Sequence, residues 1–376
     1  GSVRVAEFFA GIGLIRMALE QNGAQVLWAN DIDRGKREMY AQNFGGDDFL
    51  LDDIRNVRGA SLPHVDVATA SFPCTDLSLA GNRRGLAGEQ SGLFWEFARV
   101  LDEMQGHRPY ALLIENVPSF ASSHGGSDLF HAIRRLNELG YWCDLLIADA
   151  RHFVPQSRPR LFIVGSRDRF PLESDWSPSA IRPPWVGRFV QRHPELNLHA
   201  LDLTLPERDT GTLAGVVDRL SLDDSRWWDA TRAQRFEDEL SPLQRERYDA
   251  MRALGSMTWA TAYRRTRNGK PAWEIRSDSI SGCLRTARGG SSKQAVVEAG
   301  FGAARIRWMT GSEYARLQGA GEYRFDGISE GRVLFAFGDA VCVPVISWLT
   351  REYLVPLLST ELTDIRWKVD RMLVGV

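Results

Sequence analysis

A cysteine in a proline-stiffened loop is the first residue in this 376-residue sequence whose setting points to chemistry. Cys74 lies in the run Ser71-Phe72-Pro73-Cys74-Thr75-Asp76-Leu77-Ser78, directly after an apolar run at 65–70 that predicts a strand. Open α/β sheets bind their ligands at the carboxyl ends of such strands. An isolated cysteine is more often a small buried side chain. In this loop Cys74 is a candidate nucleophile, and the basic, glycine-rich stretch 81–88 after it is a candidate lid over a polyanion.

Two more polar motifs lie beside predicted strands. Glu115 ends the strand at 111–114, where burial favours the protonated form of a carboxyl group and suits it to general acid catalysis. The alternative is a surface glutamate that caps a loop. The run Gln156-Ser157-Arg158-Pro159-Arg160 precedes the strand at 161–164 and is predicted to place both arginines on one face. That arrangement suits a pyrimidine carbonyl and a phosphate; the alternative is a solvated basic turn.

The first predicted strand leads into a glycine turn typical of nucleotide-binding folds. The run Phe9-Ala10-Gly11-Ile12-Gly13 opens a helix, where free N–H groups and bare backbone approach a ligand. A tight turn without a ligand is the alternative, because the third glycine of the dinucleotide fingerprint is missing. Asp31 ends the next strand, where a carboxylate accepts hydrogen bonds from ribose hydroxyls. Asp53 follows a third short strand and is placed to meet an adenine amino group, unless it is a solvated loop residue.

The elements that must position these residues alternate along the first 165 residues. Apolar runs predict strands at 3–9, 25–29, 65–70, 111–114 and 161–164, and helical periodicity predicts helices at 13–21, 34–43, 92–105 and 127–139. This alternation is typical of a doubly wound α/β sheet. It ends near residue 170, where prolines cluster, and an apolar helix at 341–357 has no core of its own. We therefore expect a first domain at 1–175, a second at 176–322, and a segment at 323–376 that packs back on the first.

Composition excludes several classes of protein. An apolar content of 44% with 25% charged residues fits a globular chain rather than a disordered or fibrous one. No apolar run approaches the roughly 18 residues of a membrane helix, so we expect a soluble protein. Four scattered cysteines without a CxxC pair predict neither a disulfide framework nor a zinc site, and we expect no metal.

The net charge of −2 argues at first against a nucleic-acid partner, yet the charges are segregated. The stretch 201–250 holds twelve acidic and seven basic residues, whereas 264–308 holds ten basic and three acidic ones. Of the 46 basic residues 42 are arginine, which donates in a fork to phosphates and guanine edges. The second domain is therefore a candidate nucleic-acid binder, and a solvated charged face is the alternative.

Six motifs in one order give the sequence a resemblance to the DNA (cytosine-5)-methyltransferases. The first four are Phe9-Ala10-Gly11-Ile12-Gly13, Pro73-Cys74, Glu115-Asn116-Val117 and Gln156-Ser157-Arg158-Pro159-Arg160. After a long variable region come Arg307-Trp308-Met309-Thr310-Gly311-Ser312-Glu313-Tyr314-Ala315-Arg316-Leu317-Gln318-Gly319 and Gly338-Asp339-Ala340-Val341-Cys342-Val343-Pro344-Val345. The resemblance implies a doubly wound, Rossmann-like domain that binds S-adenosylmethionine, and a smaller, mostly irregular or β target-recognition domain.

The resemblance also implies roles for individual residues. Cys74 would add as a thiolate to C6 of a flipped-out cytosine, and Glu115 would hold and protonate N3. Arg158 and Arg160 would bind the base and orient Cys74. The implied S-adenosylmethionine site comprises Phe9, Ala10, Gly11, Ile12, Gly13, Asp31, Ile32, Asp53, Ile54, Pro73, Asp339, Ala340 and Val341. The implied DNA contacts are Ser78, Arg83, Arg84, Arg264, Arg265, Arg285, Arg288, Ser291, Ser292 and Lys293.

Four sites depart from the family's pattern, and each changes an expected contact or turn. Ala320-Gly321 follows Gly319 where Phe-Pro is common, so a looser turn is expected there. Asp339 stands where the last motif usually has asparagine, which puts a carboxylate near the cofactor. Cys283-Leu284 stands where the recognition region usually has Thr-Leu or Thr-Ile, beside the flipped base. Ile32 stands where an aromatic residue often follows the ribose-binding acid, so the adenine contact would be aliphatic.

The expected activity is DNA (cytosine-5)-methylation, in a bacterial restriction-modification system or as an orphan methylase. We expect a monomer that works on double-stranded DNA in the cytoplasm, at the nucleoid, with a restriction endonuclease as a candidate partner and no membrane. A transfer RNA cytosine-5 methyltransferase shares the catalytic residues, although the large basic variable region favours duplex DNA. A catalytically inactive DNA-binding homologue and a nicotinamide-dependent oxidoreductase are further alternatives. The retained Cys74 and Glu115 disfavour the former, and the missing third glycine disfavours the latter.

Overall fold

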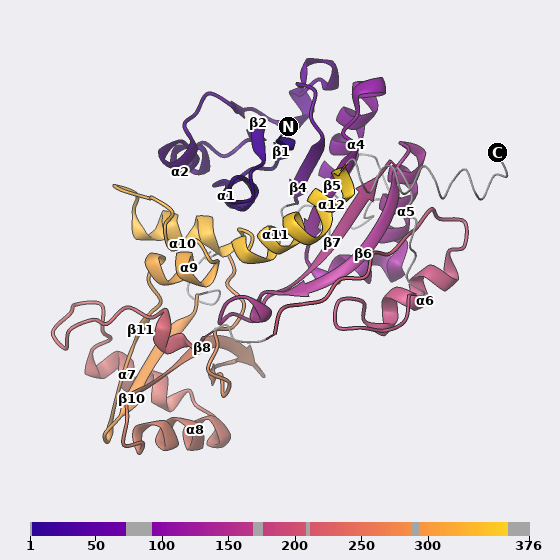
Figure 1. Ribbon diagram of the computed structural model, residues 1–376. Coiled ribbons are helices and arrows are strands. Elements are labelled where there is room, and N and C mark those ends of the chain that lie inside the picture. The colour runs from indigo at the N-terminus through magenta and orange to yellow at the C-terminus, as the bar shows by residue number, and fades with distance from the viewer. Residues whose placement is uncertain (1, 73–91, 168–175, 208–210, 287–292, 360–376) are drawn as a thin grey trace. The chain divides into compact units, whose positions relative to one another are not determined.

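The chain divides into two compact units in the computed structural model, which describes residues 2–72, 92–167, 176–207, 211–286 and 293–359 (Figure 1). Unit 1 comprises Gly1–Asp149, Pro159–Leu205 and Val345–Val376. Unit 2 comprises Ala150–Arg158 and Pro206–Pro344. Each unit is therefore built from segments that are far apart in the sequence.

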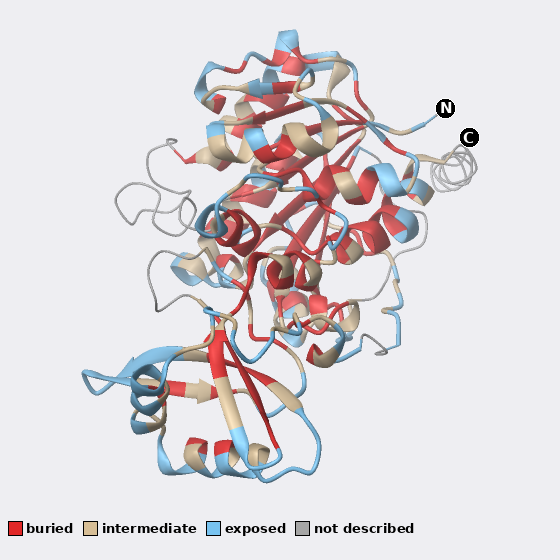
Figure 2. Cartoon of the chain, turned by 90° about the vertical axis from the view of Figure 1, so that its left-hand side faces the viewer, coloured by how far each residue is buried: buried red, intermediate tan, exposed pale blue. Residues whose placement is uncertain are grey.

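Unit 1 is built on a seven-stranded mixed sheet in the order β3-β2-β1-β4-β5-β7-β6. Strands β1 to β5 run parallel, whereas β7 is antiparallel to both β5 and β6. The central strands are largely apolar, as expected of a sheet covered on both faces, and they are buried along most of their length (Figure 2). The strands are β1 (Arg4–Phe8), β2 (Gln25–Asp31), β3 (Phe49–Leu51), β4 (Val67–Ser71), β5 (Ala111–Asn116), β6 (Trp142–Asp149) and β7 (Pro159–Ser166).

Helices complete the doubly wound α/β fold predicted from the sequence. Phe97, Leu101 and Ile133 belong to a large apolar core shared by the sheet and the helices α4, α5 and α6. Tyr40 packs α2 on a smaller core with Phe49 of β3. The unit 1 helices in the first 205 residues are α1 (Leu14–Gln21), α2 (Arg34–Phe44), α4 (Leu93–Met104), α5 (Ser127–Glu138) and α6 (Pro184–Arg192).

Unit 2 contains a four-stranded antiparallel sheet in the order β11-β10-β8-β9, so it is more regular than the sequence suggested. Its core is rich in tryptophan: Trp228, Trp273 and Trp308 pack together, which places Trp228 in a structural role. The helices α7 and α8 are largely exposed on their outer sides (Figure 2). The elements are α7 (Ala230–Asp238), α8 (Pro242–Arg252), β8 (Thr258–Arg267), β9 (Lys270–Ile275), β10 (Ala295–Gly300), β11 (Ala303–Trp308), α9 (Gly311–Leu317) and α10 (Glu330–Gly338).

The unit boundaries differ from the domain boundaries expected from the sequence. Residues 176–205 belong to unit 1 rather than to a second domain, because α6 buries Val186 and Phe189 in the unit 1 core. Residues 323–344 belong to unit 2. The chain does return to unit 1 after residue 344, where the Tyr353 hydroxyl donates to the buried carboxylate of Asp144 on β6 at 2.6 Å.

The segment Glu330–Leu358 is long and apolar enough, by length and composition, to cross a membrane. This finding corrects the expectation that no segment approaches that length. In the structure 78% of its most apolar window is buried, and core helices of soluble proteins pass the same test. The segment is not one regular helix, since α10 ends at Gly338 and is followed by α11 (Val343–Leu349), a π-helical turn (Thr350–Leu354) and α12 (Val355–Leu358).

Candidate active site

The ends of two adjacent parallel strands bring Ser71 and Glu115 together. Ser71 of β4 lies opposite Glu115 of β5 in the sheet register, and its hydroxyl donates to the Glu115 carboxylate. The Phe72 N–H donates to the Glu115 carbonyl at 3.3 Å. Glu115 is only 7% exposed, so it is not a surface cap. The sequence predicted the acid at this sheet edge, but it did not reveal Ser71 as its partner.

Arg160 approaches the other oxygen of the same carboxylate. It is the second residue of β7, which pairs with β5, and its Nε lies 3.4 Å from Glu115 Oε1. The structure thus brings two of the four predicted catalytic residues, Glu115 and Arg160, into one ion pair at the carboxyl end of β5.

Arg158 is engaged differently from Arg160. β7 begins at Pro159, so Arg158 precedes the strand, and the alternation of side chains along a strand does not apply to it. The residue as a whole is only 2% exposed. Its guanidinium donates to the carbonyl oxygens of Leu284 and Ala340, each at 2.8 Å. The expectation that both arginines share one strand face is therefore wrong for Arg158. Its contacts are those of a residue that positions backbone.

The glycine turn after β1 has the shape and donors that a nucleoside requires. Phe9 and Gly11 adopt left-handed backbone, with φ of 53° and 54°. The Gly11 and Asp33 N–H groups donate to the two oxygens of Asp31 at 2.8 and 2.9 Å, and burial raises the pKa of Asp31. Each oxygen keeps a lone pair for a ribose hydroxyl, and Ile32 beside it is 67% exposed. These residues fit the nucleoside part of S-adenosylmethionine.

A buried polar cluster behind this turn fixes α1, and the sequence did not point to it. Glu7 of β1 accepts hydrogen bonds from the Arg16 N–H and the Tyr40 hydroxyl, both at 3.1 Å. Glu7 thus satisfies a free N–H of the first helical turn, because Gly13 at the N-cap has no side chain to do so. A Cβ at Gly13 would lie 2.8 Å from the Tyr40 ring, so this glycine serves packing. Burial raises the pKa of Glu7 to about 8.

The other predicted cofactor residues have local roles in the structure. Asp53 caps the short helix Ile54–Asn56, accepting from the Arg55 N–H at 2.9 Å and pairing with its guanidinium at 3.1 Å, which is the behaviour of a loop aspartate. Ile54 lies in the unit 1 core. Three further residues of the predicted cofactor site have buried side chains: Ala10, Ile12 and Val341. Asp339 is exposed at the end of α10.

Several predicted residues lie outside the described part of the chain. Phe72 is the last described residue before the first of these gaps, and its ring packs on Phe9 of the glycine turn at 4.9 Å between centroids. The strand that leads to the cysteine motif is therefore in contact with the turn predicted to hold the cofactor. The residues outside the described ranges are Pro73, Cys74, Ser78, Arg83, Arg84, Arg288, Ser291 and Ser292, together with the lid predicted at 81–88.

The predicted DNA-binding residues of unit 2 fall into two groups. Arg264 forms a bidentate pair with Glu239, at 3.1 and 3.2 Å, and Arg265 pairs with Glu274 at 3.2 Å. Lys293 lies over the Trp308 ring at 5.7 Å. Arg285 is exposed, and among the described residues no ion pair or hydrogen bond engages its guanidinium. An anionic ligand can therefore reach Arg285 without displacing an acidic partner, unlike Arg264 and Arg265.

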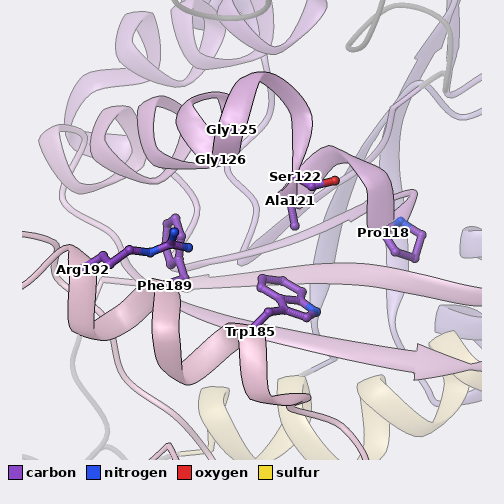
Figure 3. Close-up of a pocket in the computed structure, with 8 residues that line it drawn as sticks. All are labelled: Pro118, Ala121, Ser122, Gly125, Gly126, Trp185, Phe189 and Arg192. Carbon is purple, nitrogen blue, oxygen red and sulfur yellow. The ribbon is translucent and has the colours of Figure 1, made fainter.

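A cavity of about 400 Å³ lies between α6 and the turns that follow β5 (Figure 3). Trp185 and Phe189 of α6 form one wall, and Pro118 and Ala121 form another. None of the residues predicted for catalysis or cofactor binding lines it. The cavity is thus separate from the strand ends that hold Glu115.

The structure thus has a doubly wound α/β fold in which Ser71 and Glu115 are paired at the ends of adjacent strands. The family model described as C-5 cytosine-specific DNA methylase matches residues 3–354. The chain therefore belongs to the C-5 cytosine-specific DNA methylase family.

Two relatives illustrate how far the sequence similarity reaches. The type II methyltransferase M.HhaI of Haemophilus parahaemolyticus is 30% identical over 221 residues, which are 58% of this chain and 62% of that protein. The type II methyltransferase M.Bsp6I of Bacillus sp. strain RFL6 is 34% identical over 170 residues, 44% of this chain and 53% of that protein. The match thus extends over less than two thirds of either relative.

Solved structures are similar over almost the whole fold. The Entamoeba histolytica methyltransferase EhMeth superimposes with a TM-score of 0.64 at 14% identity, covering 96% of this chain and 99% of that one. The S. pombe Dnmt2 methyltransferase gives a TM-score of 0.60 at 18% identity, covering 96% and 100%. At these identities the likeness supports the fold alone.

Proposed function

We propose that this protein transfers a methyl group from S-adenosylmethionine to C5 of a cytosine in a specific duplex DNA sequence. The observation that carries the proposal is the buried Glu115 carboxyl group at the end of β5, held by Ser71 and Arg160. Ser71 precedes Cys74 by three positions in the sequence, so one strand end supplies both a nucleophile and a ligand of the acid. Membership of the C-5 cytosine-specific DNA methylase family supports the same reaction.

In the proposed mechanism Cys74 and Glu115 act on the two ends of one conjugated system. The Cys74 thiolate forms a bond to C6 while the Glu115 carboxyl group donates its proton to N3, so no negative charge builds up on the ring. The addition makes C5 nucleophilic. As C5 takes up the methyl group, N3 returns its proton to Glu115. A base then accepts the C5 proton while the Cys74–C6 bond breaks, which restores the aromatic ring and releases the thiolate.

Ser71 and Arg160 position the acid rather than react. The Ser71 hydroxyl donates to one oxygen of Glu115 and the Arg160 guanidinium approaches the other, so the two together fix the plane of the carboxyl group. Catalytic groups held in a productive orientation lower the barrier without any new contact to the substrate.

S-adenosylmethionine, when bound, supplies an electrophilic sulfonium methyl group. In the proposed site Asp31 accepts from the ribose hydroxyls and the exposed Ile32 side chain covers the adenine. Gly11 brings bare backbone to the ligand.

We propose that the substrate is double-stranded DNA and that the protein acts on it as a monomer. It would belong to a bacterial restriction-modification system or be an orphan methylase. C5 and C6 lie inside the base stack, so the cytosine must be flipped out at a cost of roughly a few kcal/mol. The basic stretch 264–308 of unit 2 supports this choice.

Incubation of the pure protein with labelled S-adenosylmethionine and either a randomised duplex library or transfer RNA tests the proposal. We expect label in DNA, and bisulfite sequencing of the library should show protection of one cytosine within one sequence motif. Labelling of transfer RNA alone would assign the substrate to RNA. No labelling of either would contradict the proposed activity.

A further inference from the structure

Unit 2 contains a cluster of three buried polar side chains that no step of the proposed reaction uses. Gln156 and Gln318 are fully buried and Arg158 is 2% exposed. Polar groups buried to this extent are costly unless they are hydrogen-bonded, and a charged group is the most costly. The partners of this cluster therefore show what it holds in place.

One set of partners belongs to the segment Cys283–Arg285, which contains the exposed Arg285. Gln156 Oε1 accepts from the Leu284 N–H at 3.1 Å, and the Arg158 guanidinium donates to the Leu284 carbonyl at 2.8 Å. Both backbone groups of Leu284 are thus bound by the cluster. The backbone that presents Arg285 has its register fixed by side chains that come from another part of the sequence.

The other set of partners belongs to the segment Gly338–Val343. Arg158 donates to the Ala340 carbonyl at 2.8 Å, and Gln318 Nε2 donates to the Phe337 carbonyl at 2.8 Å and to the Ala340 carbonyl at 3.2 Å. The Val343 N–H donates to the Gln318 carbonyl at 2.8 Å. A hydrogen bond of 3.2 Å from Gln156 Nε2 to Gln318 Oε1 joins the two halves of the cluster.

The two segments also touch each other directly. A Cβ on Gly338 would lie 2.1 Å from the Arg285 carbonyl oxygen, so only glycine allows this approach of the two backbones. Neither segment can therefore move toward the other without a backbone clash, and a movement away breaks hydrogen bonds of the buried network. Buried hydrogen-bond networks of this kind favour a single arrangement.

We propose that Gln156, Arg158 and Gln318 are positioning residues that couple cofactor binding at Gly338–Val343 to target recognition at Cys283–Arg285. The inference rests on the proposed function, together with the cofactor contacts that the resemblance implies at Asp339, Ala340 and Val341 and the DNA contact it implies at Arg285. The hydrogen bonds described above for these three side chains all go to protein groups. They transmit occupancy of the cofactor site by holding Ala340 and Leu284 in one hydrogen-bonded network, and such coupling is reciprocal for the two ligands.

Hydrogen exchange of the wild-type protein, with and without S-adenosylhomocysteine and without DNA, tests the inference directly. We expect the ligand to slow exchange about threefold or more in peptides covering 338–343 and also in peptides covering 281–286. Slowing confined to 338–343 would overturn the coupling while leaving the proposed function intact. If the ligand does not bind, the proposed function fails and the inference falls with it.

Two matched glutamine variants assign the effect to the cluster. Gln318→Met removes the amide bonds to Phe337 and Ala340, whereas Gln244→Met removes another buried amide of unit 2, which accepts from the Ile275 N–H at 2.8 Å. We expect Gln318→Met to keep the response at 338–343 and lose it at 281–286, and Gln244→Met to keep both. Arg158→Lys is the second variant, because lysine keeps the charge but not the fork. An unchanged response at 281–286 in both cluster variants would overturn the assignment.

Discussion

At the scale of single residues, Glu115 is held by two neighbours that differ in chemistry. Ser71 donates a neutral hydroxyl hydrogen bond from the adjacent strand, and Arg160 places a cation near the opposite oxygen. Hydrogen bonds between neutral groups contribute less than those to charged groups, but each still stabilises the arrangement. Ser71 is therefore an energetic part of the site, although it makes no contact with the substrate in the proposed mechanism.

Ser71→Ala removes this hydrogen bond and leaves the strand in place. Glu115 is uncharged in its acid form, and a hydrogen bond between neutral groups is worth about 0.5–1.5 kcal/mol, so we expect kcat to fall about 2- to 10-fold with little change in DNA affinity. Ser61→Ala, which removes an exposed hydroxyl bonded to the Arg58 carbonyl, is the control. Steady-state kinetics with labelled cofactor measure the effect, and an unchanged kcat in Ser71→Ala would exclude Ser71 from positioning the acid.

Glu7 gives a prediction for pH dependence. Its pKa in the folded protein, about 8, exceeds the ordinary value of 4.5 because the side chain is buried. The folded state then holds this proton more tightly than the unfolded state, so the stabilising contribution is present below about pH 4.5 and is lost as the pH rises towards 8. We expect the melting temperature of the wild type to fall more between pH 5 and pH 8 than that of Glu7→Gln, which cannot ionise. An equal fall in melting temperature between pH 5 and pH 8 for the two proteins would contradict the raised pKa of Glu7.

At the scale of elements, the sequence predicted the strands and their order along the chain better than the contacts between them. Glu115 was placed at a strand end because the apolar run 111–114 is unambiguous. The pairing of β4 with β5, and hence Ser71 with Glu115, depends on sheet order, which no local pattern encodes. Arg158 was misplaced for a related reason: it lies one residue before β7, and its guanidinium binds tertiary partners instead.

The two glycines of α10 provide a test of the close backbone approach in unit 2. A Cβ at Gly338 would collide with the Arg285 carbonyl, whereas at Gly331 it meets nothing within 4 Å. We expect Gly338→Ala to destabilise the protein by about 1–3 kcal/mol, as overpacking does. Gly331→Ala should be neutral or stabilising by about 0.4–1 kcal/mol. Urea unfolding measures both, and equal effects would contradict the contact.

The arginines predicted to contact DNA differ in whether an acidic side chain already pairs with them. Arg264 is paired with Glu239, whereas Arg285 has no partner among the described residues. We expect Arg285→Ala to relax the sequence preference by about 1–3 kcal/mol at one base pair, and Arg264→Ala to change it less. Competition between cognate and single-substituted duplexes gives the preference. A larger effect for Arg264→Ala would move the reading contact to the β8–β9 hairpin.

At the scale of the whole molecule, the alternation of apolar runs with helical periodicity predicted the class of fold, but the charge pattern was only partly informative. The acidic stretch 201–250 and the basic stretch 264–308 are separate in sequence, yet Glu239 of the first pairs with Arg264 of the second. Part of the apparent positive patch is therefore neutralised inside unit 2. The domain boundaries could not be predicted from the sequence either. The surroundings of α6 are proline-rich, as in a linker, but α6 buries Val186 and Phe189 in the unit 1 core.

The central claim is that a Cys74 thiolate attacks C6 of cytosine while Glu115 donates a proton to N3. Trapping on duplex DNA with 5-fluorocytosine at the target position, in the presence of S-adenosylmethionine, tests it most directly, because fluorine at C5 blocks the final elimination. We predict a complex stable to denaturing gel electrophoresis with the wild type and none with Cys74→Ala, although Cys74→Ala still binds the duplex. A covalent complex with Cys74→Ala, or methyl transfer to ordinary cytosine by that variant, would contradict the account.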